Sequence, residues 1–292
     1  MNLTVMQDGS ERLRYTAPEL PLYVCRGDLY VFSNMAALCH WHDDVELLLC
    51  TEGYLEYNVN GEQLHVDEGN AIFVNSRQMH YGFSADGSNC NYCCYAFRPQ
   101  QLLSSDKLIS QFVLPLLTAY HIPYVILERS NNDHSILLDI LIQIDELYHN
   151  KPYGYELLAL SKVLEFWHKL FNLLKDKLED NITADTNLLA VKQMLGFIRS
   201  NYNEKITLDL IASAGGVCRT RCCQYFKKYL GLTPNAYLNS FRLEQAMQML
   251  IGTNQSVTEI ADSCGYNSSS YFTEIFTREK GCTPTQYRKK LL

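Results

Sequence analysis

The sequence predicts an α+β protein of two domains: an N-terminal β-barrel with a pair of helices, and a C-terminal all-α domain. Three observations lead to this fold class. Short apolar segments separated by turn residues run through residues 22–97, a helical period begins near residue 133, and a repeat occupies the last third of the chain. With 292 residues and 47% hydrophobic content, the chain is long enough for both domains to bury a core.

The first half of the chain has the pattern of short β-strands. Alternating or continuous apolar runs occupy residues 45–50, 53–58, 63–66, 71–74 and 92–97. Asn60-Gly61, between the second and third runs, is typical of a two-residue hairpin turn. Several short strands at near-regular spacing predict a small barrel or a sandwich.

Two helices follow the strands. Apolar residues recur every three or four positions through residues 133–148 and 155–174, and Pro152 and Gly154 separate the two stripes. We expect an antiparallel pair, which either packs both stripes on the strands or leaves part of one stripe as a homodimer interface. The polar stretch that follows predicts a linker over residues 179–190, between domains at 1–178 and 191–292.

Charge is divided between the two predicted domains. The formal net charge is −7, yet residues 183–292 hold 13 Lys and Arg against 8 Asp and Glu, whereas the preceding residues hold 12 against 24. This division favours a nucleic-acid-binding domain joined to an acidic sensor. No apolar run approaches the ~18 residues of a membrane span, and no leader pattern begins the chain, so we expect a cytoplasmic protein with no membrane partner.

The last third of the chain contains one unit used twice. When Ile211-Ala212 is aligned with Ile260-Ala261, the glycine that follows coincides, and after one inserted residue in the second copy the later aromatic residues, glycines and prolines coincide too. The matched pairs are Gly216 and Gly265, Phe226 and Phe276, Gly231 and Gly281, Pro234 and Pro284, and Tyr237 and Tyr287.

Each copy predicts a short helix, a glycine turn and a second helix with a polar outer face. The expected helices are 208–214 and 219–229 in the first copy, and 257–263 and 268–280 in the second. Their expected buried residues are Cys222, Tyr225, Phe226, Tyr271, Phe272, Ile275 and Phe276. This is the helix–turn–helix plan, whose second helix enters the major groove of DNA. The alternative, a solenoid of helical hairpins, usually needs at least three copies.

Residues 206–292 resemble the DNA-binding domain of the AraC/XylS family of transcriptional regulators. The second unit carries the family signature in Ile260-Ala261, Gly265-Tyr266, Tyr271-Phe272, Phe276, Gly281, Pro284 and Tyr287-Arg288. The resemblance implies that a long helix over residues 234–250 joins the two units, and that Arg242 on this helix is structural rather than a base reader.

The resemblance also implies which residues contact DNA. Base contacts would come from Thr220, Cys223 and Gln224 in the first recognition helix, and from Ser269, Ser270 and Thr273 in the second. Arg219, Arg221 and Lys227 would hold phosphates. Ser268 and Glu274 complete the candidate DNA-binding set.

Two residues depart from the family pattern. Cys218 stands at the N-cap where Ser is usual, and because a thiol accepts backbone hydrogen bonds poorly, this helix start is expected to be about 1 kcal/mol weaker. Glu274 stands where Arg is common, so it would repel phosphate or accept from a cytosine amino group. We therefore expect the first unit to supply most of the DNA affinity.

The acidic domain holds a second set of candidate residues. His40, His42, Glu46 and His80 resemble the two motifs of the cupin barrel. On a continuous strand His40, His42 and Glu46 would share one face, and His80 would approach from a neighbouring strand. The sequence departs from the motifs at Asn34, Asn75, Arg77 and Ser84.

Three interpretations of these four residues are open. They line a pocket for a small-molecule effector such as a sugar, they hold a divalent transition-metal ion, or they are hydrogen-bonded residues of the barrel wall. We assign no cofactor and predict a homodimeric transcription regulator that binds double-stranded DNA, responds to a small molecule and is not an enzyme. The alternative is a metal-dependent cupin enzyme with a helical interaction module.

The 11 cysteines are expected to be reduced in the cytoplasm. Cys90 and Cys93 have the CxxC spacing, but a strand places positions three apart on opposite faces, which argues against a metal or redox site. A redox role for Cys218, Cys222 and Cys223 is likewise less favoured than one core cysteine at 222 beside exposed neighbours.

Overall fold

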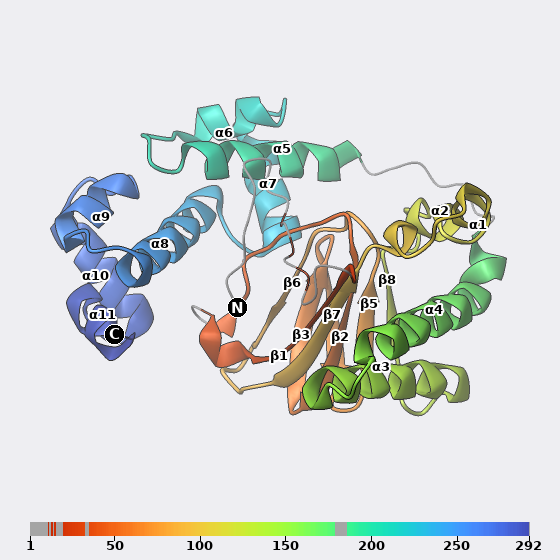
Figure 1. The fold of residues 1–292 in the computed structure, drawn as a ribbon. Helices are drawn as coiled ribbons and strands as arrows, with labels where there is room; N and C mark the ends of the chain where they lie inside the picture. The colour runs from red at the N-terminus through yellow and green to blue at the C-terminus, as the bar shows by residue number, and fades with distance from the viewer. Residues whose placement is uncertain are drawn as a thin grey trace. The chain divides into compact units, whose positions relative to one another are not determined.

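The structure is a computed structural model that describes residues 11, 13, 15, 20–32, 35–178 and 186–291. The chain forms two compact units, whose main segments are Cys39–Ala184 and Asp185–Leu292. Figure 1 shows strands in the first of these segments and helices throughout the second.

The N-terminal unit contains two antiparallel sheets. The first has the strand order β1 (Leu22–Asp28), β7 (Asn91–Phe97), β2 (Val45–Glu52), β5 (Ala71–Val74) and β8 (Tyr124–Leu127). The second has the order β4 (Glu62–Asp67), β3 (Tyr54–Val59) and β6 (His80–Phe83). The five predicted strands are all present, and Asn60 and Gly61 form the predicted hairpin turn with φ of +52° and +91°.

The predicted α+β fold class is confirmed, but the described strands form two sheets and not a closed barrel. The chain leaves the first sheet for the second at Gly53, whose φ of +79° lies in the left-handed region. A Cβ at this position would lie 2.8 Å from the carbonyl oxygen of Asn89. This corner ends the pairing of β2 with β7, and the following strand β3 pairs with β4 and β6 instead.

The two predicted helices are α3 (Asn132–Asn150) and α4 (Tyr155–Leu174), which lie side by side along the five-stranded sheet (Figure 1). Leu47, Phe73 and Tyr95 on the sheet share one core with their apolar stripes. The helices therefore cover this sheet face, and the homodimer interface stays a prediction. The short helices α1 (Asp106–Phe112) and α2 (Leu114–Leu117) lie between β7 and β8 in the chain.

The C-terminal unit consists of seven described helices. They are α5 (Thr186–Asn201), α6 (Leu208–Ala214), α7 (Arg219–Leu230), α8 (Pro234–Gly252), α9 (Val257–Ser263), α10 (Ser269–Lys280) and α11 (Pro284–Leu291). The four predicted helices of the two repeats are confirmed to within one residue at each end. Among the described residues, no helix combines the length and apolar character needed to cross a membrane.

The predicted linker over residues 179–190 is wrong in its second half, because α5 begins at Thr186. The stripe of Val191, Met194, Leu195 and Ile198 is fully buried and explains why this segment is helical. The first part of the predicted linker, residues 179–185, lies outside the described residues.

Arg242 on α8 has the structural role that the family resemblance implies. Its guanidinium donates to the carbonyl oxygens of Tyr202 at 2.7 Å and Glu204 at 2.8 Å. Arg288 on α11 does the same for Leu250 at 3.0 Å and Gln255 at 2.6 Å. Both arginines satisfy carbonyl groups near helix ends that would otherwise lack partners.

Candidate functional site

The recognition helix of the first helix–turn–helix unit, α7, separates its buried and exposed residues cleanly. Cys222 and Phe226 are buried, whereas Thr220, Cys223 and Gln224 are exposed. Because residues three and four apart share a helix face, these three exposed side chains and Lys227 lie on one face. The structure thus brings together the residues predicted to read bases in this unit.

The residues at the two ends of α7 determine how the helix begins and ends. Cys218 occupies the N-cap and makes no side-chain cap hydrogen bond, as predicted from its thiol. Nearby backbone N–H groups, that of Arg221 first, nevertheless lower the pKa of the Cys218 thiol. Gly231, with a φ of +67°, ends the helix.

Two of the predicted phosphate-binding residues have partners within the C-terminal unit. Arg219 is paired with Asp209 on α6, through two hydrogen bonds to the carboxylate, and this contact raises the pKa of Arg219. Lys227 donates from Nζ to the carbonyl oxygen of Gly231 at 3.2 Å. Both contacts lie at the exposed surface, where water and DNA phosphates compete with them.

Replacing Asp209 with asparagine is expected to strengthen DNA binding several-fold at low salt. The change removes a negative charge and releases Arg219 for a phosphate, which should steepen the dependence of log affinity on log salt by about 0.9. Gel-shift titrations at several salt concentrations measure both effects. Asp262→Asn on α9 is the matched control, because it removes an exposed charge in the same unit, and an equal gain in the control would contradict the release of Arg219.

The second recognition helix, α10, lines a shallow groove of about 700 Å³. Its walls are Val257, Thr258, Ser269, Ser270, Thr273, Glu274, Thr277 and Arg278, which include four of the predicted DNA-binding residues. Ser268, also predicted to contact DNA, is the N-cap of α10 and accepts from the backbone N–H of Tyr271 at 3.2 Å.

The structure corrects the predicted core at Tyr271. It was expected to be buried, but 47% of its surface is exposed. Phe272, Ile275 and Phe276 form the buried stripe of α10, and Tyr271 lies one position outside that period.

The candidate effector residues of the N-terminal unit converge, although not by the predicted route. β2 begins at Val45, so the strand does not run through from His40 to Glu46, the condition on which their shared strand face depended. His40 instead forms an isolated antiparallel bridge with His80, with N···O distances of 3.1 and 2.9 Å. Glu46 projects from the face of β2 opposite to that of Leu47 and the helices.

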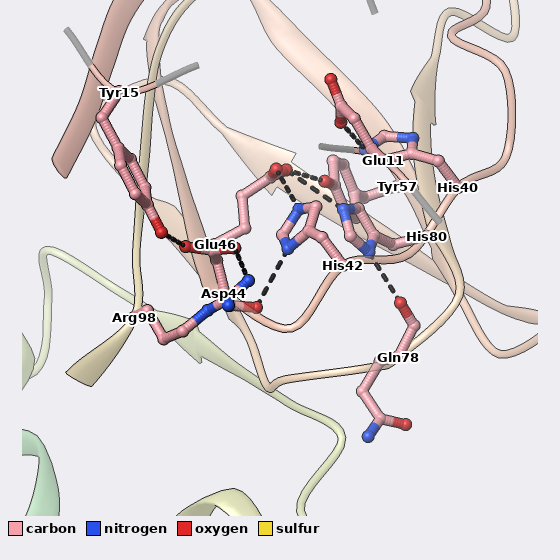
Figure 2. A network of polar contacts seen from close by, with 10 residues as sticks. All are labelled: Glu11, Tyr15, His40, His42, Asp44, Glu46, Tyr57, Gln78, His80 and Arg98. Carbon is pink, nitrogen blue, oxygen red and sulfur yellow. Dashed lines mark hydrogen bonds and ion pairs between the residues drawn. The ribbon is translucent and has the colours of Figure 1, made fainter. Parts of the chain in front are cut away.

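A second polar group lies directly before β2. Asp44 accepts hydrogen bonds from the Tyr15 hydroxyl at 2.6 Å and from Arg98 Nη2 at 3.1 Å. These contacts hold the Asp44 side chain away from the cluster, on the other side of His42 (Figure 2). No sequence pattern predicted these contacts of Asp44.

The four candidate residues form one buried cluster (Figure 2). Their exposed fractions lie between 1% and 6%, and one ligand atom from each lies within 4.8 Å of the others. Glu46 is central: its Oε2 lies 3.2 Å from His42 Nε2, and its Oε1 lies 3.5 Å from His80 Nε2. Tyr57 on β3 donates to Oε1 at 2.7 Å.

The cluster is electrostatically coupled. Burial opposes charge on Glu46, but the imidazoles of His80 and His42 outweigh it and hold the pKa of Glu46 well below its usual range. Burial alone would lower the pKa of His42, but the facing carboxylate of Glu46 raises it. Glu46 is therefore ionised near neutral pH.

The departures from the cupin motifs have local roles. Asn75 donates from its amide to the carbonyl oxygens of Leu116 at 2.8 Å and Ile122 at 3.1 Å, which fastens a loop. Arg77 pairs with Asp43 at 2.7 Å on the surface. Asn34 lies outside the described residues.

The CxxC cysteines face different neighbours, as the strand alternation predicts. Cys93 Sγ lies 3.5 Å from Asp145, whereas Cys90 Sγ lies 3.4 Å from Cys50 Sγ. Cys222 is fully buried in the core of the first repeat, as expected.

Two helix–turn–helix units in one domain, and a buried polar cluster in another, define a DNA-binding regulator with a separate sensing domain. A family model described as a helix-turn-helix domain matches residues 211–290, and one described as an AraC-like ligand binding domain matches residues 35–128. The chain belongs to the AraC family of transcriptional regulators.

Several known proteins are similar to this chain over most of its length. An uncharacterised HTH-type transcriptional regulator of Bacillus subtilis, YdeC, is 31% identical over 99% of this chain and 98% of its own. The melibiose operon regulatory protein of Escherichia coli K12 is 26% identical over 86% of this chain and 83% of its own. A crystal structure of ToxT from Vibrio cholerae with bound unsaturated fatty acid aligns with 94% of this chain and 97% of its own, at 14% identity and a TM-score of 0.47.

Proposed function

We propose that this regulator binds one specific DNA sequence as a homodimer, and that a small-molecule effector held in the N-terminal unit controls the binding. The exposed faces of α7 and α10 carry the DNA-binding part of the proposal, because each presents polar side chains at the spacing that reads base edges. In this proposal the protein acts by binding and not by catalysis.

Two observations bear on the chemical class of the effector, and they favour different classes. The melibiose operon regulatory protein, whose name refers to a sugar, is 26% identical to this chain, which favours a sugar. The buried cluster of three histidines and Glu46 instead favours a metal ion, for the reasons given in the next subsection. In either case the effector must bind one state of the regulator more tightly than the other, since equal affinity would shift nothing.

The DNA-binding part is tested by selecting bound sites from a random DNA library with the full chain. Two recognition helices per chain predict enriched sequences with two contacted segments about 10 base pairs apart, and two such sets in a homodimer. The double variant Gln224→Ala and Ser270→Ala should lose this enrichment. No enrichment with the native chain, or the same enrichment with the variant, would contradict the proposal.

The effector part is tested by thermal shift of the full chain against a panel of sugars and divalent metal ions. A ligand that binds the native state raises the melting temperature by mass action. The same ligand should change the affinity for the selected DNA. A ligand that stabilises the chain without changing DNA affinity would contradict its role as effector.

A further inference from the structure

We propose that His40, His42, Glu46 and His80 form a site for one divalent transition-metal ion. This inference deepens the proposed function, because it rests on the N-terminal unit being the sensor and names the ligand class that the sensor holds. Three imidazoles and one carboxylate, all buried, meet between strands of the two sheets (Figure 2).

The spacing of the side-chain atoms suits a single ion. Metal–nitrogen and metal–oxygen bonds of about 2.1 Å place neighbouring donors of a tetrahedral site about 3.4 Å apart. His42 Nε2 and His80 Nε2 lie 3.2 and 3.5 Å from the two carboxylate oxygens of Glu46. All four residues offer a donor atom within 4.8 Å of the others, so only small side-chain shifts would bring them to one ion.

The hydrogen bonds behind two of the rings orient them for a cation. His42 Nδ1 lies 3.0 Å from the carbonyl oxygen of Asp44, and His80 Nδ1 lies 2.9 Å from that of Gln78. A carbonyl only accepts, so each Nδ1 donates to it and each ring turns its Nε2 toward the cluster. Metal-binding histidines are typically held by such a contact from the second ring nitrogen.

The polar atoms of the cluster are also incompletely satisfied. His80 Nε2 is buried, and its distance of 3.5 Å from Glu46 Oε1 leaves it without a hydrogen bond. A second carboxylate borders the cluster, since Glu11 Oε2 lies 3.4 Å from His40 Nε2 and the Glu11 side chain is 6% exposed. One divalent ion would satisfy the facing nitrogen and oxygen atoms together.

The donor set identifies the class of ion. Calcium and magnesium prefer sites made of oxygen, whereas three imidazoles with carboxylate oxygen suit zinc, copper, nickel or iron. Tyr57 donates to Glu46 Oε1 at 2.7 Å and orients the carboxylate from behind. A sugar needs a cavity of several hundred Å³, while these side chains touch one another and are almost fully buried.

The test uses the full chain, purified without a histidine tag and stripped with a chelator, then titrated with Zn²⁺ or Co²⁺. We expect one ion per chain by elemental analysis, visible Co²⁺ absorption bands typical of nitrogen and oxygen ligands, and a higher melting temperature on loading. Less than half an ion per chain, with no change in melting temperature, would overturn the proposal.

Variants locate the site. Glu46→Gln and His80→Ala should each weaken binding by more than about 100-fold, and Tyr57→Phe by about 10-fold, since loss of an outer partner typically costs 10- to 100-fold. Glu46→Gln keeps the shape of the side chain, so its circular dichroism should match the native chain and separate loss of metal from loss of fold. Unchanged binding in Glu46→Gln would overturn the proposal.

His65→Ala is the matched control. His65 lies in the same unit and also contacts two carboxylates, Glu56 at 2.7 Å and Asp67 at 3.1 Å, but it is exposed. Its loss should leave metal stoichiometry and affinity unchanged. Equal loss of binding in His65→Ala would show that the metal associates with surface groups, which would overturn the proposed site.

The test of the metal site and the test of the proposed function can fail independently of each other. DNA selection on the same preparations reports the regulator role without reference to metal. Selected DNA sites and a melting shift with a sugar but not with metal would overturn the metal site alone. Stoichiometric metal binding in a chain that selects no DNA would support the metal site and overturn the proposed function.

Discussion

Replacing Gly265 with alanine is expected to destabilise the C-terminal unit by roughly 2–5 kcal/mol, the sum of a left-handed backbone cost and an overpacking cost. Gly265 ends the turn after α9 with a φ of +74°. A Cβ there would lie 2.6 Å from the carbonyl oxygen of Tyr202 and 2.9 Å from the carbonyl carbon of Asn203. These are backbone atoms, so the segment between α5 and α6 would have to move.

The homologous glycine of the first repeat is the matched control. Gly216 has a φ of +63°, but a Cβ there would meet no heavy atom within 4 Å. Gly216→Ala should therefore cost only the backbone term, about 1–2 kcal/mol. The two variants compare the same substitution with and without a steric clash.

Urea unfolding can follow the two units separately. Both tryptophans, Trp41 and Trp167, belong to the N-terminal unit, so their fluorescence should be unchanged in either variant. Far-ultraviolet circular dichroism at the helical minimum reports the helices of both units, so a loss of signal that tryptophan fluorescence does not share belongs to the C-terminal unit. Equal losses of stability in Gly265→Ala and Gly216→Ala would contradict the clash with Tyr202.

The helices of the repeats could be predicted because residues at or next to their ends mark where each helix begins and ends. Pro234 opens α8 next to the Thr233 cap, and Gly231 and Gly281 end the two recognition helices in the left-handed region. Helix α5 was missed, although its buried stripe beginning at Val191 has a helical period, because polar residues before it suggested a linker. Its apolar spacing was the signal that would have found it.

The β domain was less predictable because strand pairing is a long-range property. The four-residue strand β8 (Tyr124–Leu127) follows two helices and pairs with β5, some fifty residues earlier. No local pattern specifies that partner, nor the change of sheet at Gly53. Strands β2 to β5 and β7 were predicted, whereas β8 and the division of the strands between two sheets were not.

In the candidate metal cluster, the four central residues could likewise be predicted, but the groups that support them could not. His40, His42, Glu46 and His80 were identified from their resemblance to the cupin motifs, and the structure brings them together. Their supporting groups were not identified, because Tyr57 comes from the other sheet and the Nδ1 partners are backbone carbonyls. A residue type carries no signal for a contact made by its backbone or by a strand paired elsewhere in the fold.

The second large effect concerns how α7 binds DNA. Gln224→Ala is expected to lower affinity for the selected site by about 10- to 100-fold, because a bidentate base contact is worth about 1–3 kcal/mol. On DNA altered at the contacted base pair the native chain and the variant should bind alike. Gln224 is exposed on α7, so its removal should leave the fold intact.

Lys227→Ala should act differently, because an ammonium group that holds a phosphate carries no sequence information. We expect a similar loss on every DNA sequence and a salt slope shallower by about 0.9. Binding also requires Lys227 to leave the carbonyl oxygen of Gly231, 3.2 Å away, which costs little at an exposed site. Lys107→Ala on α1 controls for the change in net charge and should leave the slope unchanged. Gel shifts at four salt concentrations on matched and altered DNA separate the two roles, and indistinguishable losses in Gln224→Ala and Lys227→Ala would contradict this division.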